Sequence, residues 1–163
     1  MEELIDVVNK NNVVIGSATM KEVYEKKLNH RIVHVLIFNA KDEIFLQKQS
    51  MKKRFCPGYW TTSAGGHVQK DESYKHAAKR ELKEEIGIDV SLKLILETTF
   101  DVYGMIKFLN VFKGFSQGPF KFNEEEVMDG KWFSLAEIKG IIKENKVIHP
   151  ELAHIINKLS SVL

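Results

Sequence analysis

Residues 66–88 read GHVQKDESYKHAAKRELKEEIGI, and this stretch decides how the chain folds. From Ser73 to Ile86 it contains neither glycine nor proline and consists mostly of good helix formers, so it predicts a helix. Gly87 follows at the place where a glycine commonly ends a helix. We therefore expect a loop, a helix and a turn in this order.

This helix is amphipathic, but its apolar face also carries glutamates. At about 100° per residue, Glu81 and Glu85 fall inside the apolar arc, and Glu84 lies at its edge. Glutamates three or four positions apart repel one another by roughly 0.2–0.5 kcal/mol per exposed pair, and by more when they are partly buried. The pattern therefore indicates that a cation neutralises them. The apolar positions themselves are Tyr74, Ala77, Ala78 and Leu82.

A divalent metal ion satisfies this requirement better than a side chain does. Arg80 can neutralise only part of the charge, whereas a hard cation accepts several carboxylate oxygens at once. Magnesium keeps part of its water shell and usually works together with substrate phosphates. The helix therefore predicts a Mg²⁺ site formed by Glu81, Glu84 and Glu85, with Mn²⁺ as a substitute, and phosphoryl chemistry at that site.

The composition fits one intracellular domain. The chain has 163 residues, of which 44% are apolar, enough for one sizeable core but not for two. The formal charge of +2 gives no broad footprint of a nucleic-acid binder, so we expect no stable nucleic-acid complex. Cys56 is the only cysteine, which excludes an internal disulfide and favours a reducing, cytoplasmic setting.

No part of the sequence indicates a membrane protein. Residues 1–8 are acidic where a signal peptide is basic, and they lack its long apolar stretch. No apolar run elsewhere reaches membrane-spanning length. We therefore expect no membrane partner.

The rest of the chain predicts a sheet with helices. Turn-prone residues 9–12 separate two apolar runs, which predicts a hairpin within an N-terminal extension over residues 1–30. The β-branched run 32–38 and the run 44–47 are expected to pair at the centre of the sheet. Further strands are expected at 60–64, 92–102, 106–112 and 127–133.

Two helices are expected in residues 134–163. Ser134 is followed three residues later by Glu137, which is a capping-box pattern. Pro150 lies near the first turn of a second apolar-periodic segment, which ends at Leu163. We therefore expect a single domain over residues 1–163, of the α/β or α+β class.

The stretch 66–88 resembles the Nudix box, the signature of the Nudix hydrolase family. The match extends over more than twenty residues and includes five specified charged positions, which makes it far more specific than a lone glycine motif. The matching positions are Gly66, Glu72, Arg80, Glu81, Leu82, Glu84, Glu85, Gly87 and Ile88.

The resemblance implies both a fold and a reaction. The fold is a mixed sheet sandwiched between helices, and the reaction is hydrolysis of a diphosphate linkage in a nucleoside diphosphate derivative or a related phosphorylated metabolite. The expected partner is this small molecule, and a homodimer is possible. The implied roles are metal binding for Glu81, Glu84 and Glu85, a loop-bracing ion pair for Arg80 and Glu72, and turn formation for Gly66 and Gly87.

We interpret the mechanism as attack of a metal-activated water on phosphorus. Glu84 and Glu85 are the expected catalytic residues of the box. A further base is expected in the acidic triplet 124–126, where relatives often place an additional glutamate, and we favour Glu126. A solvated acidic turn is the alternative for this triplet.

Substrate contacts are expected from residues between the central strands and the box. Lys48, Lys53 and Arg54 belong to a basic patch suited to gripping a phosphate, although a solvated loop explains it equally well. Trp60 is a candidate for stacking on a nucleobase, with core packing as the alternative.

Roughly positions 13–140 also resemble, more loosely, the subgroup similar to isopentenyl diphosphate isomerase. That isomerase needs a cysteine where this chain has Gly65, and two glutamates where it has Met105 and Lys107. Isomerisation and a non-catalytic nucleotide-binding module therefore stay as alternatives to hydrolysis. The segments that carry this resemblance are Asn29-His30-Arg31, Pro57-Gly58-Tyr59-Trp60, Gly66-His67 and Glu126-Val127-Met128-Asp129.

Overall fold

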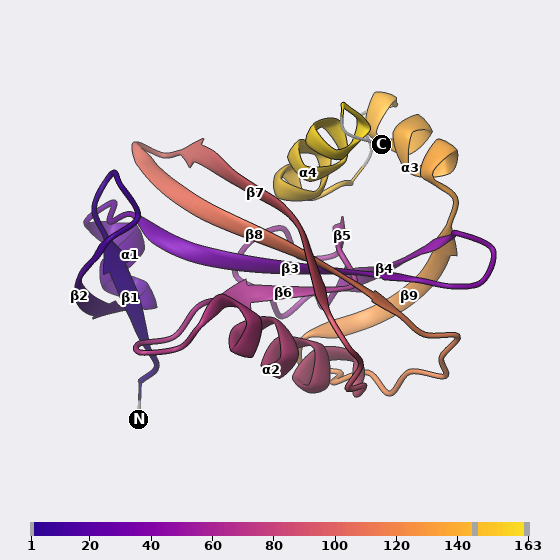
Figure 1. Cartoon of the computed structure of the whole chain (residues 1–163), viewed down its shortest axis with the longest axis horizontal. Helices are drawn as coiled ribbons and strands as arrows, with labels where there is room; N and C mark the ends of the chain where they lie inside the picture. Colours follow the sequence, from indigo (N-terminus) through magenta and orange to yellow (C-terminus); the bar gives the residue numbers. More distant parts are fainter. Residues whose placement is uncertain (1, 145–146, 162–163) are drawn as a thin grey trace.

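The computed structural model describes residues 2–144 and 147–161, and within these residues nine strands form one mixed sheet. Helix α2 covers one face of the sheet, and α3 and α4 cover the other (Figure 1). This arrangement confirms the expected mixed sheet between helices. The strands are β1 (Leu4–Val8), β2 (Val14–Thr19), β3 (His30–Phe38), β4 (Ile44–Gln49), β5 (Trp60–Thr61), β6 (Ala64–His67), β7 (Lys93–Val102), β8 (Met105–Phe115) and β9 (Val127–Phe133), and the helices are α1 (Met20–Glu25), α2 (Tyr74–Ile86), α3 (Leu135–Lys143) and α4 (Pro150–Ser160).

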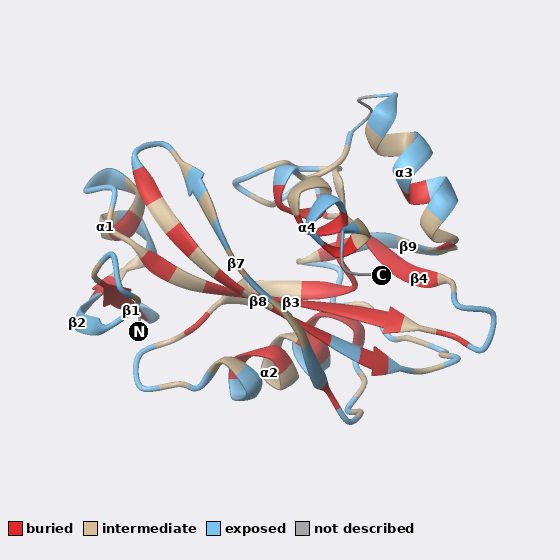
Figure 2. Ribbon diagram, turned by 45° about the horizontal axis from the view of Figure 1, so that its top comes forward, coloured by how far each residue is buried: buried red, intermediate tan, exposed pale blue. Residues whose placement is uncertain are grey.

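Strand β3 organises the sheet because it pairs with four other strands. It runs antiparallel to β1, β4 and β6 and parallel to β8. Its side chains alternate between two cores, as expected for a strand that is buried on both faces. Val33 and Val35 pack in the core beneath α2, whereas Ile32 and Leu36 pack in the core beneath α4. Figure 2 shows that most of β3 is buried, and that β4 and β8 beside it also carry many buried positions.

The helix ends follow the rules that the sequence indicated. Ser73 caps α2, since its hydroxyl oxygen accepts the backbone N–H of His76 at 3.1 Å. Gly87 ends α2 in the left-handed conformation, with φ of 74°. Ser134 and Glu137 form the capping box of α3. Helix α4 begins at Pro150 and continues to Ser160, and its expected end at Leu163 lies outside the described residues.

Two local features differ from the expectation. The N-terminal extension contains the short helix α1, which begins with a capping box between Thr19 and Glu22 that we had not used. The single strand expected at 60–64 is divided into β5 and β6. Between them, Ser63 uses its hydroxyl group to accept the N–H of Ile37 and to donate to the carbonyl of Phe45, in place of regular strand pairing.

None of the described helices is long and apolar enough to cross a membrane.

A glycine at the end of α2 and a glycine within α3 offer a pair of alanine substitutions with opposite expected effects. Gly87 has a positive φ, and a Cβ there would lie 3.0 Å from the carbonyl oxygen of Lys121, so Gly87→Ala should destabilise the protein by roughly 1–2 kcal/mol. Gly140 lies within α3 with open space around its Cβ position, so Gly140→Ala should stabilise by roughly 0.5–1 kcal/mol. Urea unfolding measures both, and a stabilising Gly87→Ala would contradict the left-handed turn.

Candidate active site

The box places α2 against β6 at very short range. A Cβ at Gly66 would lie 2.3 Å from Glu81 Oε1, so a side chain there would displace this carboxylate. The neighbouring Gly65 donates its backbone N–H to Glu85 Oε1 at 3.0 Å. The two glycines therefore let the backbone of β6 lie directly beside the carboxylates of the helix.

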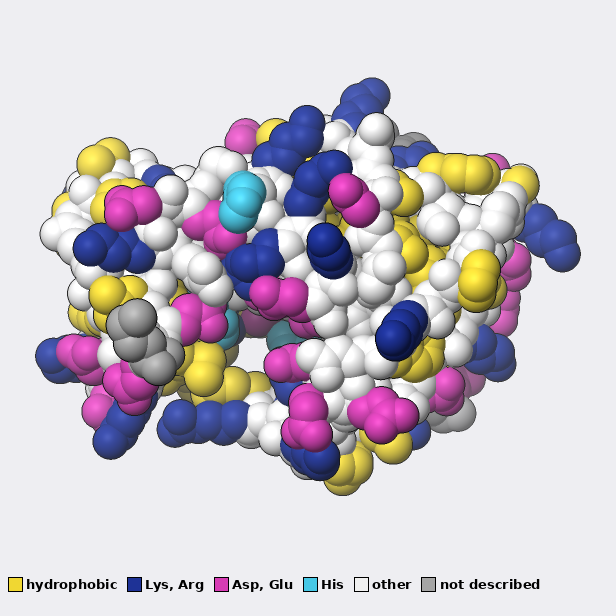
Figure 3. All heavy atoms as spheres, turned by 90° about the horizontal axis from the view of Figure 1, so that it is seen from below, with side chains coloured by type: hydrophobic (Ala, Val, Ile, Leu, Met, Phe, Trp, Pro, Cys, Tyr) yellow, Lys and Arg dark blue, Asp and Glu magenta, His cyan; other side chains and the backbone are white. Residues whose placement is uncertain are grey.

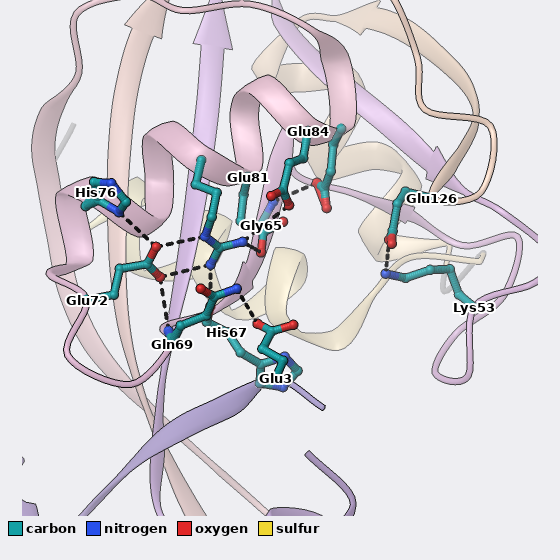
Figure 4. A network of polar contacts seen from close by, with 12 residues as sticks. Glu3, Lys53, Gly65, His67, Gln69, Glu72, His76, Glu81, Glu84 and Glu126 are labelled. Carbon is teal, nitrogen blue, oxygen red and sulfur yellow. Dashed lines mark hydrogen bonds and ion pairs between the residues drawn. The ribbon is translucent and has the colours of Figure 1, made fainter. Parts of the chain in front are cut away.

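Arg80 joins the loop of the box to both of its flanking elements, and its partners His67, Glu72 and Glu81 are labelled in Figure 4. Its Nε and Nη2 donate to the two oxygens of Glu72 at 2.8 and 2.9 Å, which makes the expected ion pair bidentate. Nη2 also donates to the carbonyl of His67 at 3.1 Å, and Nη1 donates to Glu81 Oε1 at 2.8 Å. One guanidinium group therefore ties the loop to β6 and α2.

The three metal-binding candidates differ in exposure in the way that the helical wheel indicated. Glu85 is 4% exposed and accepts a second hydrogen bond, from Gln47 Nε2 at 2.7 Å. The side chain of Glu81 is 13% exposed, and that of Glu84 is 55% exposed. Two of the three carboxylates therefore lie on the buried side of α2.

Burial works against the charged form of these two carboxylates. It raises the pKa of Glu81 to about 7, against the lowering effect of Arg80, and the charge of Glu84 raises this pKa further. Burial also places the pKa of Glu85 well above its ordinary value, and the charge of Glu81 adds to the effect. The pKa of Glu72 is shifted in the opposite direction, to about 2, because hydrogen bonds from Arg80, Gln69 and His76 together outweigh the effect of burial.

This donor set fits a hard divalent cation. Mg²⁺ prefers carboxylate oxygens, and one such ion would offset the burial of Glu85 as well as its repulsion with Glu81. Among the described residues, no three acidic, histidine or cysteine side chains already converge as a ready-made metal site. The hydrogen bonds from Arg80, Gln47 and Gly65 go to the Oε1 atoms of Glu81 and Glu85, so the Oε2 atoms of these carboxylates are the candidate metal ligands.

The carboxylates line a pocket of about 550 Å³. Glu81, Glu84 and Glu85 form one wall, and Lys53 and Arg54 belong to the loop that lines it from another side. In the view from the α2 side, acidic and basic side chains surround a hollow in the surface (Figure 3). The arrangement brings the candidate metal-binding and phosphate-binding residues to one cavity.

Two of the expected substrate contacts do not reach this pocket. Gln47 and Gln49 line it, and because side chains alternate along β4, the intervening Lys48 points to the other face. Trp60 is likewise absent from the lining, and its ring packs edge-on against Phe133, with centroids 5.3 Å apart, beside the core under α4. Base stacking on Trp60 was therefore a wrong expectation, and core packing is correct.

The acidic triplet reaches the pocket through its last two members. Glu125 and Glu126 are part of the lining. Glu126 Oε2 accepts from Lys53 Nζ at 2.5 Å, as Figure 4 shows, and Glu125 accepts from Lys52 at 2.7 Å. Two ion pairs therefore connect the basic loop to the acidic one at this side of the pocket.

The pocket also contains charged residues that the sequence reasoning did not select. His34 and Glu151 are joined at 2.8 Å, and Glu151 and Lys107 are joined at 3.0 Å, deep in the cavity. A signal for Lys107 was present, because it occupies an inward position in the alternating pattern of β8, between Met105 and Leu109. Glu151 carried no such signal, since an acidic residue in a first helical turn is ordinary.

The geometry around Gly65 does not suit an isomerase-type cysteine. A Cβ at this position would lie 2.9 Å from both His34 Nδ1 and the carbonyl oxygen of Val33. A cysteine would therefore require His34 and the adjacent strand to move. The positions that correspond to the two isomerase glutamates are Met105, which is buried, and Lys107, which forms the ion pair with Glu151.

Comparison with known proteins agrees with this geometry. The NUDIX domain model matches residues 28–156. An uncharacterized Nudix hydrolase of Pseudomonas aeruginosa is 35% identical over 80% of this chain and 78% of its own, and isopentenyl-diphosphate Delta-isomerase 2 of Photorhabdus laumondii is 31% identical over 98% and 94%. A Deinococcus radiodurans crystal structure superposes with a TM-score of 0.83 at 22% identity, covering 96% of this chain and 98% of its own. With its box assembled in this way and most of its length matched, the chain belongs to the NUDIX domain family.

Proposed function

We propose that the protein is a Mg²⁺-dependent hydrolase that cleaves a diphosphate linkage in a nucleoside diphosphate derivative or a related phosphorylated metabolite. One observation carries this proposal: the buried Glu85 and the largely buried Glu81 repel each other and line the same pocket as the cations of the loop after β4. This arrangement is costly for a protein that binds nothing, but it suits one that binds a metal ion together with a diphosphate.

The loop cations suit the phosphate groups of the substrate. Lys53 and Arg54 line the pocket. The hydrogen bond and charge of Glu126 raise the pKa of Lys53 against the effect of burial, and the charges of Glu85 and Glu81 add to this effect. An ammonium group next to these carboxylates can contact an oxygen of a phosphate that is bound between them. Lys53 is therefore the proposed phosphate contact on the side opposite α2.

The reaction transfers a phosphoryl group to water. A water oxygen forms a bond to phosphorus, the bridging P–O bond breaks, and the leaving phosphate keeps the bridging oxygen with its electron pair. Bound Mg²⁺ would supply charge neutralisation of the phosphate oxygens and a lower pKa for the attacking water. Glu81, Glu84 and Glu85 would hold the ion, with Glu84 and Glu85 closest to the chemistry.

Glu126 is the proposed acceptor of the proton that the attacking water loses. In this structure its carboxylate is held by Lys53 at 2.5 Å, so one of its oxygens is occupied. A phosphate that attracts Lys53 would release Glu126, so substrate binding itself would free the base. A positioned base contributes roughly 10² to 10⁴ in rate.

Isomerisation of isopentenyl diphosphate is the second candidate, because the Photorhabdus laumondii isomerase is 31% identical over almost the whole chain. The absence of a cysteine at Gly65 and the contact of Gly65 with His34 count against it. Product analysis separates the two reactions, because an isomer keeps the mass of the substrate.

Glu85→Gln should abolish hydrolysis without harming the fold. The amide oxygen can still accept from Gln47 and Gly65, while the repulsion with Glu81 disappears, so the metal-free variant should unfold at the same temperature as wild type or higher. Loss of outer-shell partners of a metal typically costs about 10–100-fold, so loss of a direct ligand should reduce kcat by more than about 100-fold. Kinetics with Mg²⁺ and thermal unfolding test this, and an active Glu85→Gln would remove this residue from the site.

Glu81 should make the metal-free protein less stable as the pH rises. Its pKa of about 7 lies above the ordinary 4.5, so between these values the folded state binds more protons than the unfolded state, and stability is lost as the pH increases. Each unit of pKa corresponds to about 1.4 kcal/mol. The stability of Glu81→Gln relative to wild type should therefore grow from pH 4.5 to 7 and then level off.

Both proteins contain the same buried histidines, so the contribution of these groups cancels when the two free energies of unfolding are subtracted. Urea unfolding at several pH values, with a chelator present, measures this difference. With excess Mg²⁺ above pH 7, the wild type should become more stable than Glu81→Gln, because only the wild type keeps all three carboxylates. If the difference in stability between the two proteins stays constant from pH 4.5 to 7, the pKa of Glu81 is not raised in the folded protein.

A further inference from the structure

The inner part of the pocket contains an ion-pair network that the proposed chemistry does not use. Glu151, in the first turn of α4, lies between His34 of β3 and Lys107 of β8. Its Oε1 is 2.8 Å from His34 Nε2, and its Oε2 is 3.0 Å from Lys107 Nζ. None of these side chains is more than 10% exposed, yet all three line the pocket.

Hydrogen bonds hold the carboxylate of Glu151 from two sides. His34 Nε2 donates to its Oε1, while His34 Nδ1 forms a 2.6 Å hydrogen bond with the hydroxyl of Thr62, which also lies 3.0 Å from the carbonyl oxygen of Ala64. Burial would raise the pKa of Glu151, but His34 and Lys107 outweigh it and hold this pKa below its ordinary value. The anion therefore lies between the ammonium group of Lys107 and an N–H group of His34.

The fold alone gives no reason for these charges. The other inward residues of β8 near this position, Met105, Leu109 and Val111, are apolar and buried. Buried ion pairs lose hydration, and replacement by well-packed apolar side chains is often neutral or stabilising. The location of Lys107 and Glu151 on a pocket wall, however, gives them access to a ligand.

Hydrogen-bond donors of this network face the pocket. Lys107 has three N–H groups, of which Glu151 accepts one, and Tyr24, whose ring centre is 5.3 Å from Nζ, can accept at most one more. His149 accepts the N–H of Glu151 at its Nδ1, and because burial lowers its pKa to about 4, its neutral ring carries the proton on Nε2. His149 also lines the pocket, so at least two donors are available there.

The network adjoins the candidate metal site through one residue. His34 is paired in register with Gly65, whose N–H binds Glu85. A diphosphate at the glutamates would therefore place its attached group toward His34 and the residues beyond it. The two parts of the pocket are continuous, so a single ligand can span them.

We propose that Lys107, held in place by Glu151 and His34, determines the substrate specificity of this enzyme. It donates to oxygen or nitrogen acceptors on the group joined to the diphosphate, and it disfavours hydrocarbon groups, which would remove water from the ammonium without replacing the hydrogen bond. This inference rests on the proposed hydrolase function and names the class of its substrate: diphosphates that carry a polar, acceptor-bearing group such as a nucleoside, rather than an isoprenoid chain.

The test compares Lys107→Gln with two other variants. Lys107→Gln removes the charge but keeps a donor for Glu151, which protects the fold. Lys107→Arg keeps the charge and should retain part of the preference. Lys113→Gln is the matched control, because it makes the same change on an exposed residue of the same strand, where the ammonium lies 4.2 Å from the ring centre of Phe38.

The measured quantity is the ratio of kcat/KM for nucleoside diphosphates to kcat/KM for isopentenyl diphosphate. Sites that hydrogen-bond a polar group can reject an analogue lacking it by roughly 10⁴ to 10⁵, so we expect a ratio above about 10² in the wild type. Lys107→Gln should lower this ratio at least about tenfold, mainly through KM, and Lys113→Gln should leave it unchanged. Ribose 5-diphosphate distinguishes acceptors on the sugar from acceptors on the base.

Equilibrium binding of the same compounds separates this inference from the proposed function. Hydrolysis without preference for polar groups, or a ratio that survives Lys107→Gln, would overturn the role of Lys107 and keep the hydrolase. Binding that prefers nucleoside diphosphates through Lys107, without any hydrolysis, would keep the polar pocket and overturn the hydrolase. Neither hydrolysis nor preferential binding would reject both.

Discussion

The close approach of α2 to β6 is the constraint on which the rest of the site depends. It requires Gly66, because any Cβ there would collide with the carboxylate of Glu81. It also requires small residues on the helix, and Ala77 and Ala78 are completely buried against the sheet. As a result, Glu85 lies deep enough to accept a backbone N–H from the strand. The arrangement thus holds Glu85 beside the backbone of β6 with little exposure to water.

The positive charge of Arg80 is shared unequally between Glu72 of the loop and Glu81 of α2. Arg80 donates two hydrogen bonds to Glu72, which also binds the N–H of Gln69 and the ring of His76, whereas Arg80 donates only one hydrogen bond to Glu81. The ion pair therefore holds the loop in place, while the negative charge of the carboxylates on α2 is only partly neutralised. This division separates the residues that build the box from those that bind its ligand. A metal ion would neutralise the remaining negative charge, which lowers the stability of the metal-free protein.

The sequence was sufficient for the local features of the site. Helix ends at Ser73 and Gly87 depend on neighbouring residues, and the positions of Glu81 and Glu85 follow from the helical period, so both could be predicted. The directions of the Lys48 and Trp60 side chains could not be predicted, because the face to which a strand residue points depends on how the strand pairs. The network of His34 and Glu151 joins residues 117 positions apart, and no local pattern indicates such a contact.

Hydrolysis in ¹⁸O-labelled water, with Mg²⁺ and a panel of nucleoside and isoprenoid diphosphates, tests the central claim most directly. If carboxylates on α2 hold a metal that promotes attack of water on phosphorus, one phosphate product gains a single ¹⁸O atom, and a chelator stops its formation. The site of the label also identifies which phosphorus is attacked. A product that has the mass of the substrate and carries no label, or a diphosphate that binds and stays intact, would contradict the account.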